Sequence, residues 1–410
     1  MTMTKRNGTP RGSGPGWQIG AAFLSRLVIN TARRFIYPFA PVLSRGLDIP
    51  LTAVASMIAV NQFTGLLSLI FGPMGDRWGY RNLMLAGMGA LIIGMLIAGC
   101  LPFYTTVLVA MVLAGLSKSI FDPSILAYAG HRVPYARRGM AIGLLEISWA
   151  GSSLVGIPLA GLLIDGYGWR APFFGLGILG VLGALALCIT FPRDRRSSSR
   201  PVAQGSPGRT LKRLAGERSA LCAMLFTFCI SGANDCLFVT YGIWLEQRFG
   251  LSVVALGLSA TVIGLAELTG EGAVATLSDR VGLKLSIITG GMLSGLCYLM
   301  LPFMGRSLPL ALTGLFLLFL SFEFTIVGTI SFFTELLPDA RATMMSGYMA
   351  SAGIGRVCGA LIGGPLWMMG GIEAVGTGAA LMTGAGTLFL IWGIRDWHPG
   401  MAPVRQSRAS

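Results

Sequence analysis

The feature that most constrains this chain is a succession of apolar runs, each about 20 residues long, that occupies most of its 410 residues. A helix of that length matches the hydrocarbon thickness of a bilayer. Because lipid offers backbone groups no hydrogen-bond partner, each run is expected to be helical. We therefore predict an all-α polytopic membrane protein with twelve transmembrane helices, at about residues 18–43, 52–74, 82–102, 104–129, 139–164, 171–191, 219–245, 253–277, 285–304, 308–334, 343–369 and 374–394.

The composition excludes a soluble protein. Hydrophobic residues make up 53% of the chain and charged residues only 12%, about half the charged fraction of a soluble domain. A transmembrane β-barrel would instead show short segments of alternating hydrophobicity. The 58 glycines have no three-residue period, which excludes collagen. Small residues at this frequency are typical of helices that approach one another closely in lipid.

A polar segment divides the apolar runs into two groups of six. Residues 192–218 are basic and rich in Ser, Pro and Gly, which is the composition of a linker. We therefore predict an N-terminal six-helix half at residues 1–191, a basic linker at 192–218 and a C-terminal six-helix half at 219–410.

The distribution of Lys and Arg predicts the orientation of the helices. Twenty-two of the 31 basic residues lie in one set of loops with the termini and the linker, four lie in the opposite loops, and five lie inside spans. Positively charged loops stay in the cytoplasm. Both termini and the linker are therefore predicted to be cytoplasmic, with the chain integral to the plasma (inner) membrane and its first span retained. This distribution explains the net charge of +14 without a nucleic-acid partner, and we expect none.

A motif of glycines and charges recurs in the two halves. Between spans two and three the chain has Gly72, Asp76, Arg77, Gly79 and Arg81. Between spans eight and nine, 203 residues later, it has Asp279, Arg280, Gly282 and Lys284 in the equivalent places. An internal repeat of this kind predicts two pseudo-symmetric halves and is typical of secondary transporters.

On these residues the chain resembles the major facilitator superfamily over essentially its whole length, and within it the 12-helix drug or metabolite:proton antiporter branch. In that family the loop forms a conformational latch between the halves. The resemblance implies that role for Gly72, Asp76, Arg77, Gly79, Arg81, Asp279 and Arg280. It also implies a transport pathway lined by spans 1, 4, 7 and 10.

Two signatures of the family's proton-driven exporters are incomplete here. Met111 stands four residues before Gly115 in span four, where those exporters often carry arginine. Span five carries the broken glycine–proline string Gly156, Pro158 and Gly161. These departures leave export and proton coupling as an expectation, with uptake as an alternative.

Eleven ionisable residues lie inside the predicted spans. A charged side chain at membrane depth is unfavourable in free energy, so each of these residues is a candidate functional residue. The N-terminal half carries Arg26, Arg33, Arg34, Lys118, Asp122 and Glu146, with a net charge of +2. The C-terminal half carries Asp235, Glu267, Glu271, Glu323 and Arg356, with a net charge of −3. We predict that all of them except Arg26 form the pathway for substrate and protons. The alternative is that they only pair with one another and hold the halves in register.

Helical spacing adds detail to this set. Arg26 and Arg33 fall on one face of span one, and Arg26 is expected to snorkel toward the cytoplasmic interface. Lys118 and Asp122 are four residues apart, so that an internal salt bridge and a ligand contact both remain open.

No motif for a nucleotide, a catalytic nucleophile or a metal is present, and the seven cysteines are scattered. We expect Cys222, Cys229 and Cys236, spaced by seven, to be small packing residues.

The sequence thus predicts no enzyme, no cofactor and no metal. It predicts a monomeric secondary active transporter that moves a small amphipathic or charged molecule by alternating access, as a proton-coupled exporter. The alternatives are a metabolite uptake symporter, a passive facilitator and, less in keeping with the short termini, a membrane sensor.

Overall fold

The computed structural model describes residues 15–71, 78–133, 135–192, 216–336 and 341–395, which form helices and their connections. The helices of the N-terminal half are α1 (Pro15–Arg34), α2 (Ala40–Leu47), α3 (Leu51–Thr64), α4 (Ser68–Phe71), α6 (Tyr80–Cys100), α7 (Tyr104–Arg132), α8 (Tyr135–Gly151), α9 (Ile157–Tyr167) and α10 (Ala171–Thr190). A 3-10 turn, η1 (Gly65–Leu67), joins α3 to α4, and a π-helical turn, η3 (Ser152–Gly156), joins α8 to α9. The C-terminal half comprises α12 (Arg218–Phe249), α13 (Val253–Val281), α14 (Leu283–Met304), α15 (Leu308–Leu336) and α16 (Arg341–Gly393).

The described helices agree with the predicted spans. Nine are long and apolar enough to cross a membrane, or ten if the bent pair of α2 and α3 counts as one span. Helix α1 is less apolar because it carries three arginines. Helix α16 consists of two arms that meet at Gly370 and Gly371, where the backbone is not helical. With α1 and both arms of α16 included, the described part of the chain accounts for all twelve predicted spans, and the all-α membrane fold is confirmed.

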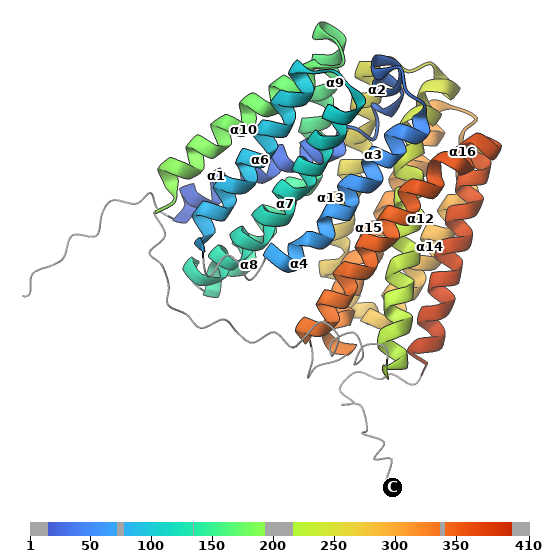
Figure 1. Ribbon diagram of the computed structural model, residues 1–410. Helices are drawn as coiled ribbons and strands as arrows, with labels where there is room; N and C mark the ends of the chain where they lie inside the picture. Colours follow the sequence, from blue (N-terminus) through green and yellow to red (C-terminus); the bar gives the residue numbers. More distant parts are fainter. Residues whose placement is uncertain (1–14, 72–77, 134, 193–215, 337–340, 396–410) are drawn as a thin grey trace, which may run out of the picture.

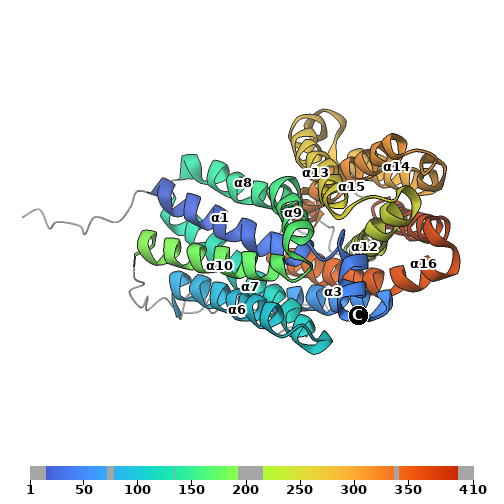
Figure 2. The ribbon, with the colours of Figure 1, turned by 90° about the horizontal axis from the view of Figure 1, so that it is seen from above.

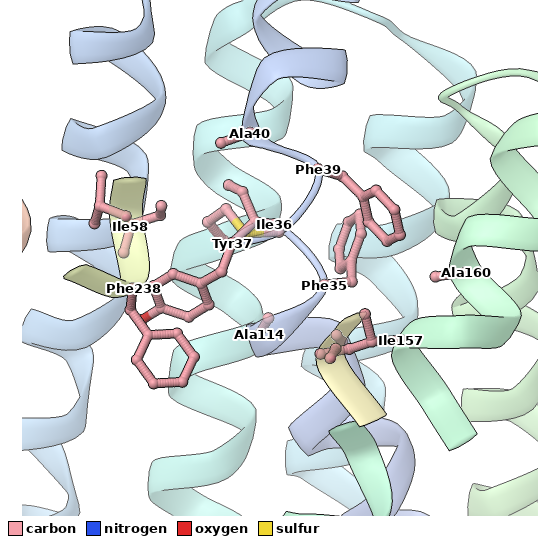
Figure 3. Close-up of a cluster of buried hydrophobic side chains, with 14 of the residues drawn as sticks. Phe35, Ile36, Tyr37, Phe39, Ala40, Ile58, Ala114, Ile157, Ala160 and Phe238 are labelled. Atoms are coloured by element: carbon pink, nitrogen blue, oxygen red, sulfur yellow. The ribbon is translucent and has the colours of Figure 1, made fainter. Parts of the chain in front are cut away.

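The first span differs from its prediction as one helix. Helix α1 ends at Arg34, residues 35–39 form turns, and α2 starts at Ala40. Pro38 has no backbone N–H and disfavours helical geometry at the residue before it, which explains the break. Figure 3 shows this segment between its two helices, with the Phe35 ring and the Tyr37 ring on opposite sides of it.

The backbone confirms the internal repeat. Six described residues have a positive φ, and they form three pairs at equivalent positions of the two halves, 202 or 203 residues apart. These pairs are Asp48 with Gly250, Gly79 with Gly282, and Gly168 with Gly371. Gly79 and Gly282 share the same conformation, with φ of 86° and ψ of 141° and 139°, immediately before α6 and α14. The motif glycines therefore mark the same left-handed turn in both halves.

The two halves lie side by side, and their contact is uneven along the helices (Figures 1 and 2). We name the two ends of the bundle the α2 end and the α4 end, after the short helices found there (Figure 1). One continuous core contains buried residues of both halves, and the residues that the C-terminal half contributes to it, including Phe238, lie toward the α2 end. Toward the α4 end the C-terminal half has its own cluster around Phe332. A separate small cluster around Ala129 belongs to the N-terminal half. The halves are therefore joined mainly at the α2 end.

Glycines allow the backbones of the two halves to approach closely at the α2 end. Gly161 of α9 and Gly257 of α13 lie so near each other that a Cβ on Gly161 would be 3.4 Å from the Gly257 Cα. A Cβ on Gly242 of α12 would lie 2.5 Å from the Pro38 carbonyl oxygen. A side chain at Gly242 would therefore force the backbones of the two halves apart, whereas at Gly161 the neighbouring atoms would have to move by only a few tenths of an ångström.

The cysteines spaced by seven lie where α12 contacts α16, as the sequence predicts. Cys222, Cys229 and Cys236 face Gly393, Gly386 and Gly363 respectively. The expectation that they serve as small packing residues is confirmed.

The outer surface of the bundle is apolar. On α10, Ile178, Leu182, Leu185 and Ile189 are between 53% and 81% exposed. A surface of this kind is suited to lipid and would aggregate in water.

Candidate functional site

A buried ion pair joins the last residue of α1 to the middle of α13 in the other half. The Arg34 guanidinium at the end of α1 donates two hydrogen bonds to the Glu267 carboxylate of α13, at 2.6 and 3.2 Å. Both side chains are less than 5% exposed. The fork of an arginine matches a carboxylate in this bidentate geometry. We call this contact the inter-half pair.

Helix α8 and the π-helical turn η3 complete the surroundings of the inter-half pair. The Trp149 indole nitrogen donates to Glu267 at 3.1 Å, and the Arg34 guanidinium lies 4.2 Å from the Trp149 ring centroid. Arg34 also donates to the Trp149 carbonyl oxygen and to the Ser152 hydroxyl. Within η3, a Cβ on Gly156 would clash with Thr31 of α1. π-Helical turns often occur at functional sites, and this one lies directly beside the pair.

A second group of charges lies entirely within the N-terminal half, and we call it the N-half cluster. Asp122 of α7 accepts from Arg26 at 3.0 Å and pairs with Lys118 at 2.6 Å. Arg26 also pairs with Glu146 of α8 at 3.0 Å, and the Glu146 side chain is 46% exposed. Lys118 also donates to Asn30 at 2.8 Å. The internal salt bridge between Lys118 and Asp122 is therefore present, whereas a ligand contact stays a prediction.

The expectation that Arg26 snorkels to the interface is wrong. Its residue exposure is 5%, and its guanidinium points to Asp122 and Glu146. Two carboxylates within reach in the low-dielectric interior attract it more strongly than distant water.

A chain of hydrogen bonds forms a second link between the halves. Arg33 donates to Asn61 and Gln62 of α3, at 3.0 and 2.9 Å. Gln62 in turn donates to Asp235 of α12 at 2.8 Å, and the Tyr37 hydroxyl donates to the same Asp235 oxygen at 3.1 Å. Asp235 therefore receives two hydrogen bonds from the opposite half.

Sequence reasoning missed Asn61 and Gln62. Both amides are buried in the apolar span 52–74, and this polar dipeptide was the available signal. An amide carries no net charge, so neither residue belongs to the ionisable set predicted from the sequence. Buried amides at membrane depth need partners as charges do.

Arg356 of α16 makes only a long contact with Asp235. The two side chains approach to 3.8 Å, and the Arg356 Nε has no hydrogen-bond partner among the described residues. The Arg356 side chain is 29% exposed, whereas that of Asp235 is 3% exposed.

Two predicted pathway carboxylates have no partner within the described part of the chain. Glu323 of α15 is 9% exposed and makes no hydrogen bond or ion pair there. Glu271 of α13 is half-buried, one helical turn from Glu267 toward the α4 end, and it too is unpaired there. Of the ten predicted pathway residues, eight thus contact polar or charged partners. The other two, Glu323 and Glu271, have no such partner among the described residues.

The predicted latch lies largely outside the described part of the structure. Gly72, Asp76 and Arg77 fall outside the described residues, and for Asp279 and Arg280 the structure describes only the backbone of α13. The latch role of these residues stays a prediction.

The last basic residue of each motif copy has a described structural contact. Arg81 donates to the Cys188 carbonyl oxygen near the end of α10, at 2.9 Å. Lys284 donates to the Ile394 carbonyl oxygen at the end of α16, at 2.8 Å. A cation at a helix C-terminus satisfies free carbonyl groups and the helix dipole. Each base therefore fixes the last helix of its own half.

Comparison with known proteins gives a consistent result across the chain. The sequence model described as Major Facilitator Superfamily matches residues 22–270 and 223–409. The chain is 26% identical over 346 residues to the uncharacterized MFS-type transporter YceJ of Bacillus subtilis (strain 168), which covers 84% of this chain and 88% of that relative. It is 25% identical over 296 residues to the multidrug resistance protein MdtG of Citrobacter koseri, with coverage of 69% and 71%.

Solved structures show the same fold. A crystal structure of a POT family transporter, in complex with a thioalcohol-conjugated peptide, superposes with a TM-score of 0.77. The match covers 93% of this chain and 96% of that chain at 16% sequence identity.

Proposed function

Because this chain belongs to the major facilitator superfamily, we propose that it is a secondary active transporter that exports a small amphipathic or charged molecule in exchange for protons. Family membership shows an integral membrane protein of a transporter class and not an enzyme. The direction, the coupling ion and the bacterial inner membrane are our proposal. Export is supported by the relative named a multidrug resistance protein.

The observation that carries the proposal is the inter-half pair. Arg34 and Glu267 belong to different halves, are nearly inaccessible to solvent and hold each other in a bidentate contact. If the halves rotate apart at this level, the pair must separate. Breaking it exposes two charges to whatever enters between the halves, so a ligand that binds there competes with the pair. The same contact can thereby link ligand binding to the position of the halves.

The uneven joint between the halves suits one state of an alternating-access cycle. The common core and the Gly161–Gly257 contact close the α2 end, while the α4 end has separate cores in each half. We assign the α4 end to the cytoplasm from the distribution of Lys and Arg. On this assignment the structure corresponds to a state closed toward the outside.

Proton coupling is supported by two carboxylates that have no partner among the described residues. Glu323 and Glu271 lie near the inter-half pair, and Glu323 is buried. Movement of the halves changes the exposure of such a group to water, and this exposure controls whether it holds a proton. A carboxylate that gains and loses a proton with each cycle would couple transport to the proton gradient.

The test starts from a thermal-stabilisation screen of purified protein against a compound library. A stabilising compound is then assayed in proteoliposomes with an imposed proton gradient and a trapped pH dye. We expect counterflow of protons and compound, abolished by an ionophore that collapses the gradient. Transport unaffected by the ionophore would identify a passive facilitator, and co-directional movement would identify an uptake symporter.

A cross-link tests alternating access itself. In a cysteine-free background, paired cysteines at Arg45 and Glu246 would tie the halves at the α2 end, where these side chains are 2.7 Å apart. We expect oxidation to stop transport and reduction to restore it. Full transport by the oxidised protein would contradict the proposed mechanism.

A further inference from the structure

We propose that the groove between α9 and α10 binds one anionic phospholipid of the outer membrane leaflet, with an acyl chain in the groove and the headgroup phosphate on Arg170. The leaflet follows from the assignment of the α2 end to the outside. The site lies on the lipid-facing surface and not between the halves. It therefore goes beyond the proposed function and depends on neither the direction of transport nor the coupling ion.

The groove is open and mostly apolar. It has a volume of about 540 Å³ and lies between α9 and α10, close to their connection at the α2 end (Figure 1). Leu163 and Tyr167 line it from α9, and Phe174 and Ile178 line it from α10. A Cβ on Gly175 would lie 2.9 Å from the Leu163 Cδ1, so the two helices touch at this glycine, which also lines the groove. An acyl chain suits such a lining.

Arg170 places a cation in this groove at the start of α10. Its Nε donates to the Gly99 carbonyl oxygen at 2.9 Å, and its Nη2 donates to the carbonyl oxygens of Gly99 and Cys100. These carbonyls end α6, where a helix has no acceptor-satisfying N–H of its own. The third nitrogen, Nη1, makes no hydrogen bond with any residue that the structure describes. The end of α6 thus holds the guanidinium in place and leaves two N–H groups for an anion.

The charge of Arg170 is not neutralised within the described part of the chain. Carbonyl oxygens accept its hydrogen bonds but carry no net charge, and its guanidinium forms no ion pair there. Asp165, the nearest acid in sequence, is exposed on α9 and does not line the groove. It is two residues from both Leu163 and Tyr167, and residues two apart in a helix face different directions. The groove therefore offers a positive charge, and a guanidinium matches the oxygens of a phosphate.

The position of the groove along the spans suits both parts of a lipid. Tyr167 and Arg170 stand at the helix ends, and Tyr167 is 83% exposed. Aromatic and basic side chains at the ends of a span lie at the level of the lipid headgroups. From there α10 runs into the bilayer with Ile178 and Leu182 exposed. A phosphate on Arg170 would thus leave the acyl chain alongside apolar side chains.

The C-terminal half repeats the helix contact of this groove. Leu366 and Gly378 follow Leu163 and Gly175 by 203 residues. A Cβ on Gly378 would lie 2.8 Å from the Leu366 Cδ1, which matches the contact of Gly175 with Leu163. The last two helical segments of each half therefore pack in the same way.

The side chains that would recognise an anionic lipid differ between the halves. Glu373 stands at the place of Arg170 and is exposed. Gly370 stands at the place of Tyr167. The C-terminal half thus has a negative charge and no aromatic ring at these two positions, so it provides an internal control for the groove.

The experiment compares two lipids that share their acyl chains and differ in headgroup charge. The full-length protein, without other cysteines, carries a fluorophore on a cysteine at Leu182, one turn beyond Ile178. It is placed in phosphatidylcholine nanodiscs that contain phosphatidylglycerol or phosphatidylcholine with brominated, quenching chains. We expect phosphatidylglycerol to quench at an at least about tenfold lower mole fraction. A label at Ala385, the equivalent position of the C-terminal half, should show no preference.

The first variant removes the cation. Arg170→Gln should abolish the preference for phosphatidylglycerol at the Leu182 label. Arg248→Gln is the matched control, because Arg248 donates to the Gly305 carbonyl oxygen at the end of α14, at 2.9 Å. Both variants lose a contact to a helix end, and only Arg170→Gln changes the groove.

The second variant fills the groove and decides the question if Arg170→Gln does not fold. Gly175→Leu should raise the mole fraction needed for quenching at Leu182 at least about tenfold. Gly378→Leu is its control, since it introduces the same side chain against the equivalent leucine of the other half. That control should leave quenching at Leu182 as in the parent.

Four results would overturn the inference. The Leu182 label shows no preference, the Ala385 label shows the same preference, Arg170→Gln and Gly175→Leu both behave like their controls, or excess inorganic phosphate abolishes the preference and so identifies a site for the free ion. The transport proposal is tested separately. The lipid site stands if the protein is a symporter or a facilitator, and it fails on any of these four results even where proton-coupled export is demonstrated.

Discussion

The N-half cluster and the inter-half pair use the same chemistry with different consequences. In the cluster, Arg26, Lys118 and Asp122 lie on α1 and α7 of one half, so their contacts persist when that half moves as a rigid body. The inter-half pair joins α1 to α13 of the other half, so its contact exists only in some positions of the halves. A buried salt bridge in this fold therefore serves stability or conformational change according to which halves supply its two members.

Among the variants that test this distinction, we expect the largest effect from Asp122→Asn, on the stability of the protein. Asp122→Asn removes the carboxylate shared by Arg26 and Lys118 and leaves two buried cations short of a partner. We expect a loss of about 3–5 kcal/mol in the free energy of unfolding, measured as a lower melting temperature in detergent. Glu146→Gln is the matched control, with a smaller loss because that side chain is 46% exposed. An unchanged melting temperature for Asp122→Asn would show that the cluster does not stabilise the half.

The next effect concerns the position of the halves. Glu267→Gln removes the charge from the inter-half pair, while Arg34 retains the Trp149 carbonyl and the Ser152 hydroxyl as acceptors. We expect a stability loss of only about 1–3 kcal/mol, together with a shift toward states open at the α2 end.

The shift is measured as a distance between spin labels. Labels replace the exposed residues Thr52 and Gln247, near the α2 ends of the two halves. Glu267→Gln should increase the population of long distances, whereas Asp122→Asn should leave the distribution as it is in the parent. If both variants gave the same distribution, the distinction between the two sites would fail.

A smaller effect is expected at the second link between the halves. Arg33→Lys preserves the charge, but an ammonium on a flexible stem cannot reproduce the fork that holds Asn61 and Gln62. We expect transport to fall and the free energy of unfolding to drop by about 1–2 kcal/mol. The two quantities are measured on the same preparation. Normal transport with reduced stability would assign Arg33 a structural role only.

The smallest effect is expected at the outer edge of the joint. Arg45 and Glu246 form a bidentate pair at the α2 end, but the Arg45 side chain is 61% exposed. Arg45→Ala should cost about 0.2–1 kcal/mol and should lose even that difference at high salt. Thermal unfolding at low and high ionic strength checks this expectation. A loss as large as that of Asp122→Asn would mean that the outer contact, and not the buried one, holds the halves together.

Local features of the sequence determined the spans, the division into halves and the repeat. Length and apolarity suffice for a span because lipid forces every backbone group to bond within its own helix. The motif glycines also predicted the repeat correctly, because Gly79 and Gly282 occupy the same left-handed turn in the two halves. The break after Arg34 could have been read from Pro38, because proline acts on its immediate neighbours.

The partners of the buried charges were decided only by the tertiary structure. The sequence placed Arg33 and Arg34 side by side on α1, yet Arg34 reaches Glu267 of the other half and Arg33 binds two neutral amides of its own half. Helical spacing fixes which residues share a face of one helix. It does not fix how that helix is rotated, or which of the distant helices it meets. Those depend on close approaches such as Gly161 to Gly257, which link residues far apart in the chain. For the same reason the sequence identified Glu323 as an acid inside a span, and only the tertiary structure showed that it has no partner among the described residues.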